Sequence, residues 1–154
     1  MMKWAEQFVE EAKAKGLHCA VTSQVHGWPE TMVVHGRKCF VKSITFNTSR
    51  NLYFQGVDPK KLEEKGDYVV LCGGIRGELR DIFIIPWKDF FETLKHGKSV
   101  NTYKSPKEYW QYKFKIKENS GKWVMMVQGG RAPELDVSQW RFVVNEAIEQ
   151  LIRD

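Results

Sequence analysis

The fold is decided by the stretch WPETMVVHGRKCFVKS, residues 28–43. Residues 31–34 and 39–46 are rich in apolar and β-branched side chains, and the HGRK segment between them is typical of a tight turn. The stretch therefore predicts two strands joined by a hairpin. Apolar runs at 68–72 and 81–86 predict further strands that are covered on both faces of a sheet.

Patterns typical of helices precede and follow these strands in the sequence. An apolar stripe at three- and four-residue spacing predicts an amphipathic helix that ends at Gly16, and its members are Trp4, Ala5, Phe8, Val9 and Ala12. Similar stripes predict a helix that contains Trp87 to Leu94 and a C-terminal helix over 137–152 that includes Trp140. Short helices are expected after Asp58 and Ser105. The order predicts one α/β domain, residues 1–154, with a mixed central sheet flanked by helices.

The composition of the 154 residues is that of a folded globular protein, with 42% hydrophobic and 28% charged residues. Lys and Arg number 24 against 19 Asp and Glu, and the net charge of +5 permits a nucleic-acid partner without establishing one. Three scattered cysteines exclude a disulfide framework. With no signal peptide and no apolar run of about 20 residues, we expect a soluble cytoplasmic protein and no membrane partner.

Glu30 stands at the head of one predicted strand, and Lys42 lies inside the next. A tight hairpin between the strands could bring both residues to one edge of the sheet. A carboxylate there can hold a divalent cation, and a nearby lysine can orient water or neutralise charge on a phosphate. The alternative is a solvated acid after a turn and a lysine whose stem follows the strand to solvent.

These residues resemble the PD-(D/E)XK nuclease superfamily, in which an acid after proline and a later acid-X-Lys strand form a magnesium site. Pro29-Glu30 matches the first element, Phe40-Val41-Lys42 matches the second, and Glu6 matches an accessory acid. The resemblance covers residues 4–95. It implies a restriction-endonuclease-like fold, a Mg²⁺ or Mn²⁺ ion, hydrolysis of DNA phosphodiester bonds, and a possible homodimer.

One departure from the family pattern leaves two hypotheses open. Phe40 stands where the pattern has a carboxylate, so either Glu63 or Glu64 supplies the missing metal ligand or catalysis has been lost. The first hypothesis is a Mg²⁺-dependent DNA endonuclease or a subunit of one, with Glu30, Glu6 and Lys42 in its site. The second is a noncatalytic nucleic-acid-binding module. A pocket for a small molecule or modified base, built from the six tryptophans, is a third idea, which core packing explains better.

A second candidate surface lies near residue 115. Three lysines alternate with apolar residues, as in a half-buried strand with one basic face, and they are Lys113, Lys115 and Lys117. Lys104 and Lys107 precede them, and the aromatic residues Tyr109, Trp110 and Tyr112 are interleaved. The lysines could bind phosphates and the aromatic rings could stack on bases, with duplex DNA as the favoured partner. The alternative is an ordinary solvated strand face.

Overall fold

The computed structural model describes residues 3–25, 28–57, 65–97, 99–101, 110–129 and 134–153. Within these ranges, the side chains of residues 3, 20–30, 99–101 and 110 are not described. The short helices predicted after Asp58 and Ser105 lie outside the described residues. The same holds for Glu63, Glu64, Lys104 and Lys107.

The described residues form three α-helices and a mixed sheet. The helices are α1 (Lys3–Ala14), α2 (Trp87–Leu94) and α3 (Val144–Arg153), with a short 3-10 turn, η2 (Ser138–Trp140). The strands are β1 (Cys19–Val25), β2 (Trp28–Val34), β3 (Arg37–Asn47), β4 (Leu52–Val57), β5 (Tyr68–Ile75), β6 (Glu78–Pro86), β7 (Ser99–Asn101), β8 (Trp110–Asn119), β9 (Lys122–Val127), β10 (Leu135–Asp136) and β11 (Arg141–Phe142). The predicted single-domain α/β architecture is confirmed.

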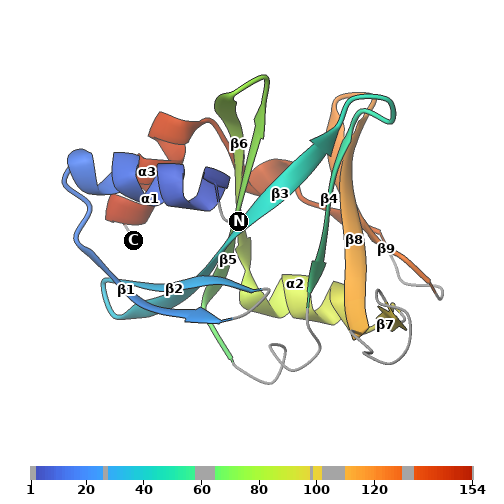
Figure 1. Cartoon of the computed structure of the whole chain (residues 1–154), viewed down its shortest axis with the longest axis horizontal. Helices are drawn as coiled ribbons and strands as arrows, with labels where there is room; N and C mark the ends of the chain where they lie inside the picture. The colour runs from blue at the N-terminus through green and yellow to red at the C-terminus, as the bar shows by residue number, and fades with distance from the viewer. Residues whose placement is uncertain are drawn as a thin grey trace.

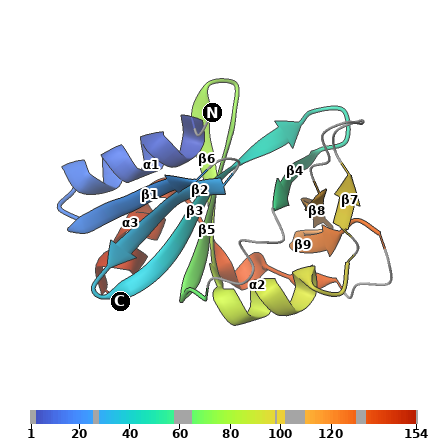
Figure 2. The same cartoon turned by 60° about the horizontal axis from the view of Figure 1, so that its bottom comes forward.

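The two parts of the sheet meet on β3. The first part of this strand pairs antiparallel with β2 and parallel with β5, and its last residues pair antiparallel with β4. One part of the sheet has the order β1-β2-β3-β5-β6-β11, and the other continues from β3 through β4, β8 and β9 to β10, with β7 against β8. Because β3 belongs to both parts, the sheet curls, and α2 lies at one end of the space between its halves (Figures 1 and 2).

One face of β3, β5 and β6 is covered by α1 and α3 (Figure 1). The predicted apolar stripe of α1 is buried, and α1 gives way to a turn in which Gly16 has a positive φ of 95°. The Ala5 backbone N–H donates a 2.9 Å hydrogen bond to Ser43 Oγ on β3. We call this layer the helix-side core; its sheet residues include Met32, Cys39, Val41, Val70, Cys72, Ile82 and Ile84.

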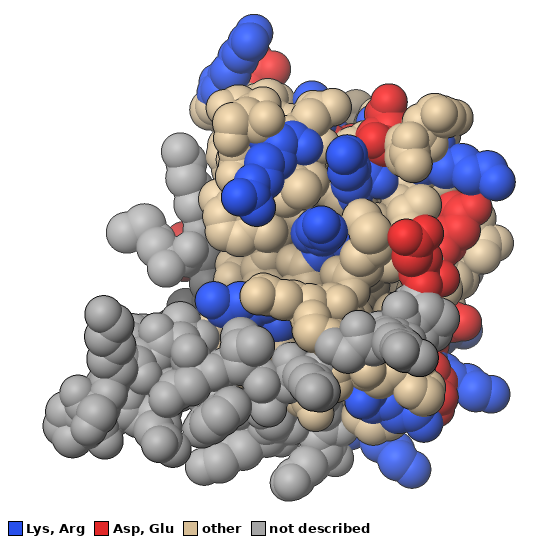
Figure 3. All heavy atoms as spheres, turned by 90° about the vertical axis from the view of Figure 1, so that its right-hand side faces the viewer, with Lys and Arg blue, Asp and Glu red and all other residues tan. Residues whose placement is uncertain are grey.

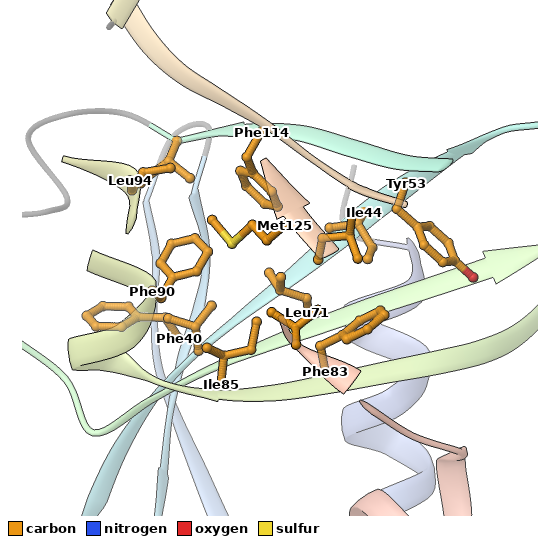
Figure 4. Close-up of a cluster of buried hydrophobic side chains, with 14 of the residues drawn as sticks. Phe40, Ile44, Tyr53, Leu71, Phe83, Ile85, Phe90, Leu94, Phe114 and Met125 are labelled. Carbon is orange, nitrogen blue, oxygen red and sulfur yellow. The ribbon is translucent and has the colours of Figure 1, made fainter. Parts of the chain in front are cut away.

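A second core fills the inside of the curl (Figure 4). Alternate residues of β3, β4, β5, β6, β8 and β9 pack in it, as the two-residue period of a strand requires. Its members come from both halves of the sheet and from α2, and they include Phe40, Ile44, Tyr53, Leu71, Phe83, Phe90, Phe114, Ile116 and Met125. We call it the inner core. It fixes the relative positions of the two halves, because neither half could bury these side chains alone.

Asp81 on β6 is fully buried and is the centre of a polar cluster at the edge of the inner core. The Tyr53 hydroxyl donates a 2.6 Å hydrogen bond to Asp81 Oδ2, and Arg80 Nε donates to the same oxygen at 2.7 Å. Arg141 donates to Oδ1 from Nε at 2.8 Å and from Nη2 at 2.6 Å. Both carboxylate oxygens are therefore hydrogen-bonded, and two guanidinium groups compensate the buried charge. Burial, followed by the bond to Asp81, raises the pKa of Tyr53.

Gly73 on β5 leaves room for the Tyr53 ring. A Cβ atom added at Gly73 would lie 2.4 Å from Tyr53 Cε1, far inside van der Waals contact. We therefore expect Gly73→Ala to lower the free energy of unfolding by about 1–3 kcal/mol, because the ring must move away from β5 and from its partner Asp81. Urea unfolding followed by tryptophan fluorescence measures the effect. A midpoint equal to that of the wild type would mean that the ring is not held against β5.

The predicted C-terminal helix is wrong at its beginning. The helix starts at Val144 rather than at residue 137, because the preceding segment is held by β10, η2 and β11. Val137 is fully buried in the inner core, and its backbone N–H donates to the Trp123 carbonyl at 2.8 Å. Trp140 belongs to η2 and packs against the inner core instead of joining the α3 stripe.

Candidate functional site

Lys42 is buried in the middle of β3, with 6% of its surface exposed. Cys39 and Val41 pack in the helix-side core, whereas Phe40 and Ile44 pack in the inner core. The alternation of the strand therefore places Lys42 on the inner-core face, between these two apolar residues. Burial lowers the pKa of Lys42 to about 8, since the charged amine is taken out of water.

Glu30 lies on β2, which pairs with β3 as predicted. In this pairing Thr31 is opposite Phe40 and Met32 is opposite Cys39. The side chain of Glu30 is not described, so its approach to Lys42 stays a prediction.

Phe40 is a core residue at the position where the family pattern has an acid. It is fully buried, and its ring centroid lies 5.0 Å from that of Trp87 on α2. A Cβ atom at Gly66 would lie 2.4 Å from the Phe40 ring, so the backbone passes directly over it. A carboxylate at this position would enter an apolar environment, which disfavours its charge. The aromatic residue is therefore part of the packing between β3 and α2.

Both predicted metal ligands, Glu30 and Glu63, lie outside the side chains that the structure describes. Glu6 is exposed on α1, and Glu63 lies outside the described residues. Within the described ranges, no group of three or more His, Cys, Asp or Glu side chains could hold a metal ion. The described side chains by themselves supply no site for Mg²⁺ or Mn²⁺, and the predicted site at Glu30 and Glu63 stays a prediction.

The cysteines are unsuited to nucleophilic chemistry. Cys39 and Cys72 are buried in the helix-side core, as the sequence predicts for small apolar residues. Burial raises the pKa of the Cys39 thiol to about 12 and raises that of Cys72 as well. A thiolate is the reactive form, so neither residue is activated at neutral pH.

The strand β8 has lysines on one face and core residues on the other. Phe114 and Ile116 are 3% and 0% exposed in the inner core, whereas Lys115 and Lys117 are exposed and Lys113 is half-buried. This alternation confirms the predicted half-buried strand. Residues two apart on a strand are separated by about 6.8 Å, so the lysines form an evenly spaced row. Figure 3 views the side of the molecule on which β8 and β9 lie, and several Lys and Arg side chains gather there.

The neighbouring strands extend this surface. Lys115 is opposite Phe54 on β4 and Met126 on β9, and Lys117 is opposite Val124 on β9. Phe54 is 44% exposed, an unusually open position for a phenylalanine. We call this surface the lysine face; it consists of Phe54, Lys113, Lys115, Lys117, Lys122, Val124 and Met126.

One aromatic residue of the lysine face is Phe54, which the sequence did not single out and which only the pairing of β4 with β8 reveals. Tyr112 packs against the inner core, on the opposite face of β8. The side chain of Trp110 is not described, and Tyr109 lies outside the described residues, so their roles stay predictions.

An acidic residue limits the lysine face on the β10 side. Asp136 is exposed and lies opposite Val124. The Ser138 hydroxyl and backbone N–H form hydrogen bonds with Asp136 that lower its pKa, so it is ionised at neutral pH. A polyanion on this surface is therefore attracted to β8 and repelled at β10.

Comparisons with family models, curated proteins and solved structures found no match for this chain. The resemblance to PD-(D/E)XK nucleases therefore rests on the sequence pattern alone. Among the described helices, none has the length and apolar character needed to cross a membrane.

Proposed function

We propose that this chain is a nucleic-acid-binding α/β domain with a restriction-endonuclease-like fold, and that the lysine face is its contact surface. The observation that carries the proposal is the row Lys113, Lys115 and Lys117 on a strand whose other face is buried. Among the described residues, none of the three forms a salt bridge with a carboxylate. Their charges are therefore available to an external polyanion.

The rigidity of β8 supports the same function. The strand pairs with β4 on one side and with β9 on the other, and its apolar residues are anchored in the inner core. Binding therefore carries no cost of ordering the backbone of β8, although it still orders the lysine side chains. Lysines contact phosphates without reading bases, so the proposal predicts binding with little sequence preference.

The salt dependence of binding tests this function. Each of Lys113→Gln, Lys115→Gln and Lys117→Gln should reduce the slope of log affinity against log salt by about 0.7–0.9, because each lysine displaces roughly one counterion from the nucleic acid. Fluorescence anisotropy with a labelled oligonucleotide gives the slope. Lys88→Gln on α2 is the matched control, since Lys88 is exposed outside the lysine face. Equal slopes for all four variants would remove the lysine face as the binding surface.

A second candidate function is the Mg²⁺-dependent or Mn²⁺-dependent DNA endonuclease. The observation that favours it is Lys42, whose pKa of about 8 suits proton transfer near neutral pH and which lies on the strand next to the one that carries Glu30. The core position of Phe40 opposes it. The pairing of two copies, which the resemblance implies, belongs to this candidate alone.

Incubation of supercoiled plasmid with the protein and Mg²⁺ or Mn²⁺ separates the two functions. The proposed binding function predicts no nicking above that of Glu30→Ala and Lys42→Ala. Nicking by the wild type that both variants lose would instead establish the endonuclease.

A further inference from the structure

We propose that the lysine face binds single-stranded nucleic acid in preference to duplex, with Phe54 stacking on an unpaired base. The inference rests on the proposed nucleic-acid-binding function and names the kind of nucleic acid. Two observations carry it, the exposure of Phe54 and its position in the register of the sheet.

Phe54 lies directly beside the row of lysines. It is opposite Lys115 on β8, so Lys113 and Lys117 are its diagonal neighbours, within reach of an aromatic ring. On its other side it is opposite Thr45 of β3, which is exposed. The row of phosphate-binding groups and the exposed ring thus occupy two adjacent strands.

This arrangement matches the two sides of an extended nucleic-acid strand. A phosphate backbone that follows the lysines of β8 has its bases on one side, over β4 or over β9. Over β4 a base meets the Phe54 ring, and over β9 it meets the half-buried Val124 and Met126. Asp136 stands beyond Val124 and repels phosphates there, which favours a backbone on β8.

A duplex cannot use the ring in this way. Its bases are stacked on one another, so their faces are covered, and its outer surface offers sugars, phosphates and the edges of bases in the grooves. An exposed phenylalanine gains little from contact with these groups. Each unpaired base has a free π-face, and aromatic stacking on such faces tolerates any sequence. The exposed ring therefore contributes most to binding when bases are unpaired, because a duplex must first be unstacked.

The test compares a labelled dT12 strand, the rU12 strand and a 12-base-pair duplex by fluorescence anisotropy. We expect the wild type to bind the single strands more tightly. Phe54→Leu should weaken single-strand binding by about tenfold and leave duplex binding unchanged, whereas Phe54→Tyr should retain the wild-type affinity because the ring is kept. Ile152→Ala removes a comparably exposed apolar side chain from α3 and is the matched control.

The possible outcomes separate this inference from the function on which it rests. If single strands and duplex bind equally well and Phe54→Leu has no effect, the single-strand preference is overturned. Nucleic-acid binding by the lysine face still stands in that case, provided that the salt slope depends on the lysines. If the protein binds neither single strands nor duplex, both the single-strand preference and the proposed nucleic-acid-binding function are overturned. Competition by a polyglutamate peptide as strong as that by dT12 would contradict the inference and indicate an acidic protein partner.

Discussion

Asp81→Ala should lower the free energy of unfolding by about 3 kcal/mol or more. The carboxylate is fully buried and accepts hydrogen bonds from Tyr53, Arg80 and Arg141. Its removal leaves the buried Tyr53 hydroxyl without its acceptor and leaves two guanidinium groups close together without the charge between them. It also removes the group that joins β6 to β4 and β11.

Equilibrium urea unfolding measures this effect, with Glu10→Ala on the exposed side of α1 as the matched control for loss of a carboxylate. The control should leave the midpoint nearly unchanged. Tyr53→Phe should cost about 1 kcal/mol, because Asp81 keeps both arginines. A loss below about 1 kcal/mol for Asp81→Ala would mean that the cluster does not hold the two halves of the sheet together.

Lys42→Met should remove a rise in stability that the wild type shows at alkaline pH. The pKa of Lys42 is lowered from 10.5 to about 8 by burial, so between these values the unfolded chain binds more protons than the folded protein. Stability contributed by this residue therefore increases as the pH rises through that window, by up to about 3 kcal/mol. Below pH 8 the cost of burying the charged amine is present in full.

The difference between the free energies of unfolding of wild type and Lys42→Met, measured from pH 7 to pH 10.5, isolates this effect from the other titrating groups. The free energy of unfolding of the wild type should increase relative to that of Lys42→Met as the pH rises. Lys115→Met, at an exposed position on β8, is the matched control for the loss of an amine. A constant difference for Lys42→Met would mean that Lys42 titrates normally and is solvated in the folded protein.

The local elements are predictable because each is specified by contiguous residues. The HGRK turn, the apolar strand at 68–72 and the stripe of α1 depend on spacing and turn residues that the sequence displays directly. The alternation around Lys115 is of the same kind. For these segments the prediction and the structure agree.

The arrangement that matters for function depends on contacts between distant segments. The curl arises because β3 is long enough to pair with β5 and then with β4, which no local pattern shows. The position of Phe54 beside Lys115 follows from the same pairing. The predicted start of the C-terminal helix is too early for a similar reason. Val137 packs in the inner core and Arg141 forms an ion pair with Asp81, and both contacts are with distant segments.

The candidate catalytic residues show the limits of a short motif. Pro29-Glu30 and Phe40-Val41-Lys42 lie on adjacent strands, as the resemblance implies. The side chains of Phe40 and Lys42, however, are both buried on the inner-core face of β3. Lys115 and Lys117 of the lysine face, by contrast, are exposed to solvent and to a polyanion.

The most direct test of nucleic-acid binding by the lysine face is an NMR titration of isotope-labelled protein with unlabelled dT12. Amide shifts should concentrate on β4, β8 and β9, at Phe54, Lys115 and Met126 and their neighbours, and should be lost when Lys113, Lys115 and Lys117 are all replaced by glutamine. Shifts confined to α1 and α3, or no shifts at all, would contradict it.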